Sequence, residues 1–117
     1  MKRPIAYITA SWGDDDVENT ARAAQYCREA YEAGFSPICP LLFLPLFLNN
    51  EIPLEHKDAT DMARDLLRRA SVLIVCGGNR ATELVKDDIA IAERLHIPAT
   101  TDKGIKAVKK LGREQHA

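Results

Sequence analysis

The chain has 117 residues, of which 46% are hydrophobic and 28% charged, and its formal net charge is -1 at pH 7. This composition is that of one soluble globular domain, and it excludes a disordered chain and a membrane-embedded protein. The small net charge gives no support to binding of a nucleic acid polymer, and the basic residues 106–113 are typical of a solvated helix face.

The first predicted elements are a strand and a helix joined by a polar turn. Residues 4–10 are β-branched and aromatic enough for a short strand, and the sequence S-W-G-D-D-D after them is rich in loop-forming residues. A helix is expected over residues 17–33, with Gly34 as its C-cap. Its predicted buried stripe consists of Thr20, Ala23, Ala24, Cys27 and Tyr31.

The second predicted strand, residues 35–39, leads into an apolar stretch that prolines interrupt. This stretch, residues 38–48, is broken by Pro40 and Pro45 and is far shorter than the roughly 20 residues needed to cross a bilayer. Together with the polar residues after it, the stretch is too long for a simple turn. We therefore expect a functional loop or a surface that contacts a partner.

Further helices and strands complete the chain. Residues 58–70 are predicted to form a helix, and Val72–Cys76 is the most hydrophobic strand candidate. A helix that begins at Glu83, a strand over 97–101 and a helix over 103–112 follow. The expected buried stripe of the helix over 58–70 consists of Met62, Ala63, Leu66, Leu67 and Ala70.

The alternation of strands with helices predicts an α/β fold. Because the strands are nearly continuous in apolar residues, they are expected to form a parallel sheet covered by helices on both faces. With four strands, the flavodoxin-like order 2-1-3-4 is expected, in a three-layer sandwich that residues 1–117 form as a single domain.

The candidate ligand-binding residues follow the first and third strands, because ligands of open α/β sheets bind where the strand order reverses. Gly77 and Gly78 permit a sharp turn, and Thr82 is a natural N-cap whose helix would favour an anion. A tight turn without a ligand explains the same residues equally well. No dinucleotide or P-loop motif is present, and neither a cofactor nor a metal is expected. The candidates are Ser11, Trp12, Gly77, Gly78, Asn79, Arg80 and Thr82.

Asp88 is the most informative residue of the third helix. At about 100° per residue, it projects near the middle of an apolar face, whereas Asp87 falls at the edge. A carboxylate on a buried face must be hydrogen-bonded, paired or protonated. Tyr7, in the neighbouring first strand, is the expected partner, and both a structural and a catalytic role for Asp88 remain open. The apolar face comprises Leu84, Val85, Ile89, Ile91, Ala92 and Leu95.

The cysteines and the start of the chain indicate the compartment. The 3 cysteines are widely spaced and form neither a disulfide framework nor a C-x-x-C pair, so reduced, buried thiols are expected. The apolar run after the initial M-K-R is too short and too β-like for a signal peptide. A cytoplasmic protein is therefore expected.

Several segments together resemble the nucleoside 2-deoxyribosyltransferase-like superfamily, and more closely its small bacterial and phage branch. They are A-Y-I-T-A-S-W, D-V-E-N-T-A-R-A-A-Q-Y-C, the aromatic-proline segment and G-G-N-R-A-T-E-L-V-K-D-D-I-A-I-A. The resemblance covers nearly the whole chain. It implies a flavodoxin-like fold in which an acid in the helix after the third strand, here Asp88, attacks the anomeric carbon of a nucleoside. It also implies that a tyrosine of the first strand, here Tyr7, orients that acid.

The chain also departs from the pattern of this superfamily. The usual nucleophile is glutamate, which is one methylene longer than Asp88. Leu41 and Leu46 stand where related chains tend to carry His and Gln, and Ser71 stands where an aspartate is common. For the second acid that the reaction needs, Asp65 is the candidate, with Asp61 as a substitute; a solvated helix face is the alternative for both.

Three functions follow from these observations. The first is an enzyme that transfers or hydrolyses the N-glycosidic bond of a nucleoside or nucleotide, with Asp88 as nucleophile. The second is a module of the same fold that binds a nucleotide-like ligand without turnover, which the missing polar residues favour. The third is a homo-oligomeric interaction protein that uses residues 41–48 as its interface.

Overall fold

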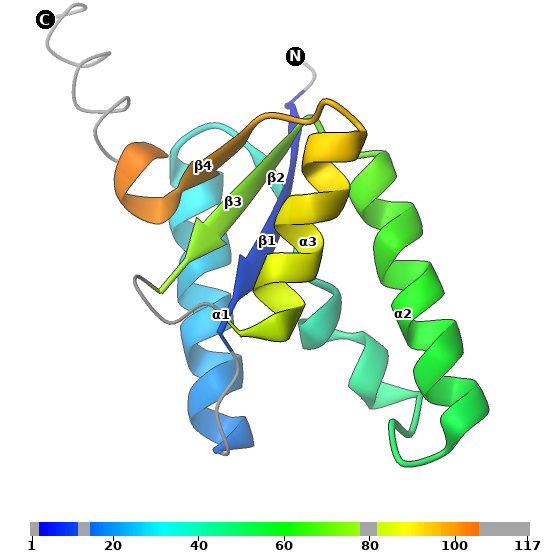
Figure 1. The fold of residues 1–117 in the computed structure, drawn as a ribbon. Helices are drawn as coiled ribbons and strands as arrows, with labels where there is room; N and C mark the ends of the chain where they lie inside the picture. Colours follow the sequence, from blue (N-terminus) through cyan, green and yellow to red (C-terminus); the bar gives the residue numbers. More distant parts are fainter. Residues whose placement is uncertain (1–2, 12–14, 78–81, 106–117) are drawn as a thin grey trace, which may run out of the picture.

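The computed structural model describes residues 3–11, 15–77 and 82–105 of the chain. Its strands and helices alternate along the sequence, as Figure 1 shows. The elements in chain order are β1 (Ile5–Ala10), α1 (Asp16–Glu32), β2 (Ser36–Ile38), the 3-10 turns η1 (Pro40–Leu42) and η2 (Leu44–Leu46), α2 (Pro53–Arg68), β3 (Val72–Cys76), α3 (Glu83–Arg94) and β4 (Ala99–Thr101).

The strands form one parallel sheet in the order β2-β1-β3-β4, which confirms the predicted α/β topology. Helix α1 lies against one face of the sheet, and α2 and α3 lie side by side against the other (Figure 1). The predicted strand Val72–Cys76 is confirmed at both ends. The helix predicted over 103–112 is helical at residues 102–105, and its remainder lies outside the described residues.

Strand β1 contributes to the core on both faces because its side chains alternate. Ala6 and Ile8 belong to the core cluster on the α1 side. Tyr7 belongs to the cluster on the opposite side, where it packs with Leu67 and Leu73. Thr9, two residues after Tyr7, therefore lies on the face that α2 and α3 cover, and it is 1% exposed.

The predicted buried stripe of α1 is wrong in part. Thr20, Ala24 and Tyr31 are exposed, whereas Asn19, Ala23 and Ala30 are buried. The predicted stripe did not include Asn19, but the helix turns the amide of Asn19 inward, and Arg22 Nη2 donates to its Oδ1 at 3.1 Å. A hydrogen-bonded amide can be buried, so the buried side of α1 differs from the side that was predicted.

Helix α2 begins at Pro53, earlier than the start predicted near Asp58. Proline is favoured at the first helical position because its fixed φ suits a helix and its missing N–H would have no partner there. The earlier start adds a turn that carries His56. Of the predicted stripe, Leu67 is fully buried, but Met62 is 42% exposed.

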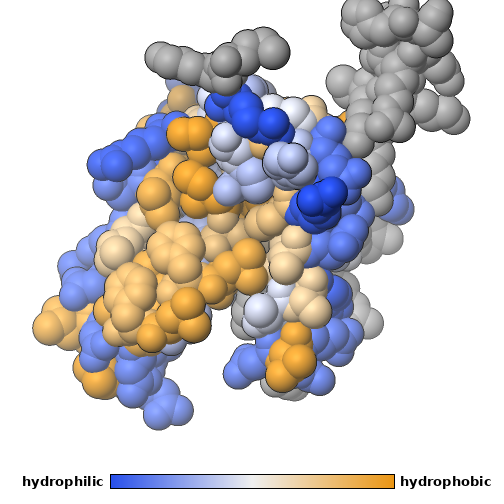
Figure 2. All heavy atoms as spheres, turned by 180° about the vertical axis from the view of Figure 1, so that it is seen from behind, coloured by the Kyte–Doolittle hydropathy of each residue, from blue (hydrophilic) through white to orange (hydrophobic). Residues whose placement is uncertain are grey.

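The proline segment, residues 40–48, divides its apolar side chains between core and surface. Pro40 and Leu44 are buried, whereas Leu46 is 83% exposed and Phe47 is 61% exposed. Figure 2 shows apolar side chains gathered on one part of the surface, toward the lower left of the view. The exposed large apolar residues of this segment and of its continuation into α2 are Phe43, Leu46, Phe47, Ile52 and Leu54.

Two further expectations concern the membrane and the thiols. Within residues 3–11, 15–77 and 82–105, no helix combines the length and the apolar character that crossing a membrane requires. The cysteines are free thiols, and Cys39 and Cys76 are buried while Cys27 is half-buried.

Candidate functional site

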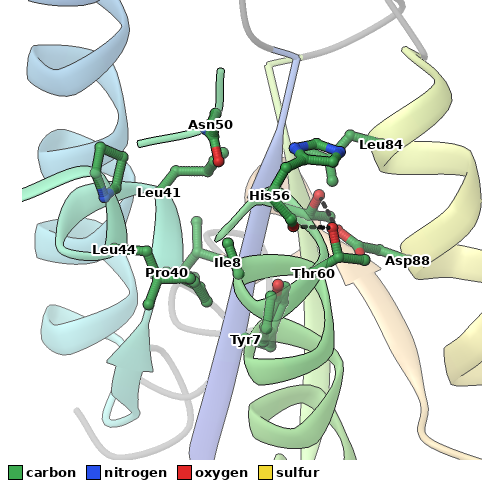
Figure 3. Close-up of a pocket in the computed structure, with 14 residues that line it drawn as sticks. Tyr7, Ile8, Pro40, Leu41, Leu44, Asn50, His56, Thr60, Leu84 and Asp88 are labelled. Carbon is green, nitrogen blue, oxygen red and sulfur yellow. Dashed lines mark hydrogen bonds between the residues drawn. The ribbon is translucent and has the colours of Figure 1, made fainter. Parts of the chain in front are cut away.

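A cavity of about 290 Å³ lies on the face of the sheet that α2 and α3 cover (Figure 3). Strand β1, the proline segment and the two helices form its walls, which are mostly apolar. Its volume is at the lower end of the range typical of small-molecule clefts. The apolar lining residues are Ile8, Pro40, Leu41, Leu44, Pro45, Ala59, Ala63 and Leu84, and the others are Tyr7, Thr9, Asn50, His56, Thr60 and Asp88.

Asp88 lies on the cavity wall and is 6% exposed. Its burial confirms the position derived from helical phase, since Val85 and Ala92 on the same side of α3 are buried as well. The hydroxyl Oγ1 of Thr9 donates a hydrogen bond of 2.7 Å to Oδ2 of Asp88. This contact joins α3 to the central strand and fixes the orientation of the carboxyl group.

The surroundings of Asp88 raise its pKa from the ordinary value of 3.8 to about 6. Burial is the largest cause, because it disfavours the charged form. The hydrogen bond from Thr9 acts in the opposite direction, Asp87 raises the pKa further, and Arg64 lowers it. Asp88 is therefore a carboxylate above about pH 6 and a neutral acid below it, so both forms are accessible near neutral pH.

Tyr7 lines the cavity beside Asp88, as predicted, but the described hydrogen bond to Asp88 comes from Thr9. Burial raises the pKa of the Tyr7 hydroxyl well above its usual range, and the nearby Asp88 carboxylate raises it further. Tyr7 therefore stays protonated and keeps an O–H donor. Thr9 could have been found from the sequence, because positions 7 and 9 of a strand share one face.

Helix α2 presents a polar edge to the cavity that the sequence analysis did not identify. His56, Thr60 and Ala63 recur along the helix at the spacing of one face, and all line the cavity. Thr60 Oγ1 donates to the carbonyl oxygen of His56 at 3.0 Å. Figure 3 shows the His56 ring beside Leu84 of α3. His56 was missed because the predicted helix began after it; Pro53 was the signal for the earlier start.

The predicted second acid is not in the cavity. Asp65 points to solvent from α2, and its carboxylate pairs with Arg69 at 3.1 Å and with Arg68 at 4.0 Å. Its substitute Asp61 is also exposed and accepts a hydrogen bond from Lys57 at 3.0 Å. Both acids therefore occupy the solvated face that was the alternative for them.

The residues predicted at the strand ends are likewise separate from the cavity. Ser11, Gly77 and Thr82 are not among the residues that line it. Gly77 has φ +90 and faces Tyr26 of α1, because a Cβ there would lie 3.2 Å from the Tyr26 hydroxyl. Thr82 is the N-cap of α3, but its side chain makes no capping hydrogen bond. The remaining candidates Trp12, Gly78, Asn79 and Arg80 lie outside the described residues.

A metal centre finds no donor set in the described part of the chain. No group of three or more His, Cys, Asp or Glu side chains there is arranged to hold a metal ion. Within the cavity, Asp88 and His56 lie among threonine, asparagine and tyrosine groups. The arrangement of these groups suits binding of an organic molecule and proton transfer.

Comparison with known families gives one match. Residues 4–102 match the family described as "Domain of unknown function (DUF7768)". Because this match covers most of the chain, the protein belongs to that family. No curated protein matches the chain.

Proposed function

We propose that this family member breaks the N-glycosidic bond of a nucleoside or nucleotide, by transfer or hydrolysis, with Asp88 as the nucleophile. One observation carries the proposal: a single oriented carboxylate with a raised pKa lies on the wall of an otherwise mostly apolar cavity. The resemblance to nucleoside 2-deoxyribosyltransferases supports the same residue. We further propose that the protein acts in the cytoplasm on a small-molecule substrate and without a cofactor.

The surroundings of Asp88 suit this chemistry. A carboxylate stabilises an oxocarbenium-like sugar centre, or forms a glycosyl ester with it, when it is charged and held in place. Thr9 holds Asp88, and the carboxyl group is ionised above about pH 6. The apolar lining offers a surface for the flat face of a base and limits competition from water. Activity is therefore expected to rise as the pH passes through about 6.

His56 is the proposed proton donor to the departing base. A base leaves more readily when a proton is supplied to it, and imidazole is the side chain most often used for this transfer. The acid proposed from sequence, Asp65, is paired with Arg69 outside the cavity. His56 lines the cavity from α2, while Asp88 lines it from α3. The two groups thus reach the cavity from different elements, so a substrate bound in the cavity would be able to contact both.

The variant His56→Gln is expected to lower kcat for base release by about 10²-fold while the protein stays folded, because general acid catalysis typically contributes 10²–10⁴-fold. Single-turnover assays with chromatographic detection of the base measure this effect. Lys57→Gln is the matched control, since Lys57 is the next residue on α2 and does not line the cavity. Equal rates for His56→Gln and the unchanged protein would remove His56 from the mechanism.

The proposal as a whole is tested on a panel of ribonucleosides, deoxyribonucleosides and their 5′-monophosphates, with and without a free acceptor base. Appearance of free base indicates hydrolysis, and appearance of a new nucleoside indicates transfer. Absence of both products from every member of the panel at pH 7.5 would refute the proposal that the protein breaks N-glycosidic bonds.

A second candidate function is binding of a nucleotide-like ligand without turnover. The cavity favours this function because most of its lining is apolar, including Leu41, which stands where related chains tend to carry His. Calorimetric titration with the same panel separates the two candidates. Tight binding without any base release supports the binding module, and absence of binding rejects both candidates.

We also propose that the protein forms homo-oligomers through its exposed apolar side chains. Leu46 and Phe47 expose most of their surface within one short segment, and contiguous apolar surface of this kind is typical of interfaces. Light scattering is expected to give a mass above that of one chain at micromolar concentration. Leu46→Asp is expected to shift the mass toward one chain, and a monomeric unchanged protein would contradict the proposal.

A further inference from the structure

A second hollow, of about 320 Å³, lies between α2 and α3 on the outer side of the molecule. We name it the arginine groove. Arg64 and Arg68 of α2 and Arg94 of α3 line it, together with Ile91 and Leu95. Its residues are distinct from those that line the cavity, and no acidic side chain is among those described for it.

The guanidinium groups of the groove have few carboxylate partners. Arg68 reaches Asp65 only at 4.0 Å, and Asp65 is held more closely by Arg69 at 3.1 Å. Within residues 3–11, 15–77 and 82–105, neither Arg64 nor Arg94 is in an ion pair with a carboxylate. The three arginines therefore make the groove locally positive, although the formal net charge of the chain is -1.

The chemistry of guanidinium identifies the anion. Its planar, charged donors match the oxygens of a phosphate in pairs, and arginine is the residue most used where such recognition matters. Three guanidinium groups around one hollow repel one another when it is empty, and a phosphate dianion would offset that repulsion.

The apolar floor of the groove narrows the ligand further. Ile91 is half-buried and Leu95 is 41% exposed, so an aliphatic surface lies between the charged side chains. An inorganic ion would leave that surface in water, whereas a phosphate attached to an apolar or aromatic group would cover it. The volume suits one small molecule.

We propose that the arginine groove binds a small organic phosphate, with Arg64, Arg68 and Arg94 on the phosphate and Ile91 and Leu95 under its apolar group. The groove continues the contact between α2 and α3 beyond the cavity, since Ile91 and Leu95 follow Asp88 at successive turns of α3. Arg64 lies near enough to Asp88 to lower its pKa. A phosphate on Arg64 therefore weakens this effect and favours the protonated form of Asp88.

Titration calorimetry with phenyl phosphate, inorganic phosphate and benzyl alcohol tests the site. Phenyl phosphate is expected to bind at least about tenfold more tightly than inorganic phosphate, because inorganic phosphate lacks the apolar group. Benzyl alcohol is expected not to bind, because it lacks the phosphate. The double variant Arg64→Gln/Arg94→Gln is expected to weaken the binding of phenyl phosphate by at least about tenfold. Leu95→Ser is expected to weaken the binding of phenyl phosphate and to leave the binding of inorganic phosphate unchanged.

Controls separate this site from the cavity and from charge in general. Arg28→Gln/Lys57→Gln removes the same charge from basic side chains that pair with carboxylates away from the groove, and it is expected to leave binding unchanged. Binding by Asp88→Asn is expected to persist whether or not the protein releases bases. No binding of phenyl phosphate at about 10 mM, equal losses in both double variants, or binding of RNA or acidic peptides alone would each overturn the proposal.

Discussion

Asp88→Asn is expected to lower base release by at least about 10³-fold, because an amide is neither a nucleophile nor a negative charge beside the sugar. The variant should fold, since the amide oxygen still accepts the hydrogen bond from Thr9 that the carboxylate accepts. Single-turnover measurement at pH 7.5 on the best substrate of the panel gives the rate, and circular dichroism confirms the fold.

Two neighbouring changes serve as controls for this result. Asp87→Asn removes the adjacent exposed carboxylate, which does not line the cavity, and it is expected to keep the rate within about threefold. Asp88→Glu keeps the charge and adds a methylene, and it is expected to retain far more activity than the asparagine variant. An Asp88→Asn protein as active as the unchanged chain would end the proposal of a carboxylate nucleophile.

The contribution of Asp88 to the stability of the protein is expected to fall as the pH rises from about 4 to about 6. In the unfolded chain Asp88 loses its proton near its ordinary pKa of 3.8, whereas in the folded protein it loses it near 6. Between these values the folded state binds more protons, so raising the pH lowers the free energy of unfolding. A shift of this size corresponds to at most about 3 kcal/mol.

Asp88→Asn removes this dependence and is therefore expected to be more stable than the unchanged protein at pH 7.5, by about 1–3 kcal/mol. The difference should shrink toward zero below about pH 4, where both chains are neutral at this position. Urea unfolding between pH 3.5 and 8, followed by circular dichroism, measures it, with Asp87→Asn as the control. A variant that is less stable at pH 7.5 would show that the site holds the carboxylate better than the neutral group.

Together, the two expected results describe a residue whose negative charge lowers the stability of the fold and is needed for the reaction. Buried, ionised acids persist where function requires them, and replacing them by neutral groups commonly stabilises the fold. Loss of activity accompanied by a gain in stability is not expected from a purely structural acid. The pair of measurements therefore separates the two roles that the sequence left open for Asp88.

The topology was predictable because it follows from patterns that single segments carry. The continuous apolar character of Val72–Cys76 predicts a central parallel strand without reference to the rest of the chain. The phase of α1 was not predictable in the same way, because Asn19 is buried through a hydrogen bond rather than through apolar character. The predicted start of α2 at Asp58 is wrong because the helix begins at Pro53, whose fixed φ suits the first helical position.

In the candidate site, too, some residues are evident from one segment and others only from the assembled fold. Asp88 was found because a charged residue in the middle of an apolar helix face is anomalous within its own segment. Thr9 and His56 are ordinary within theirs, and their significance arises only when β1 and α2 are brought to the same cavity. Asp65 belongs to the preceding helix, but it lies two positions after Ala63, which lines the cavity, so the helix turns its side chain toward solvent, where it pairs with Arg68 and Arg69.

The edges of the sheet limit how this protein can aggregate. Strands β2 and β4 lie at the two edges and have only 3 residues each. Strand β2 also contains Pro37, whose nitrogen carries no hydrogen, and Pro98 directly precedes β4. Such short edges, interrupted by proline, offer little backbone for another strand to pair with. Concentrated folded protein is therefore expected to associate reversibly through side chains and to resist growth into fibres.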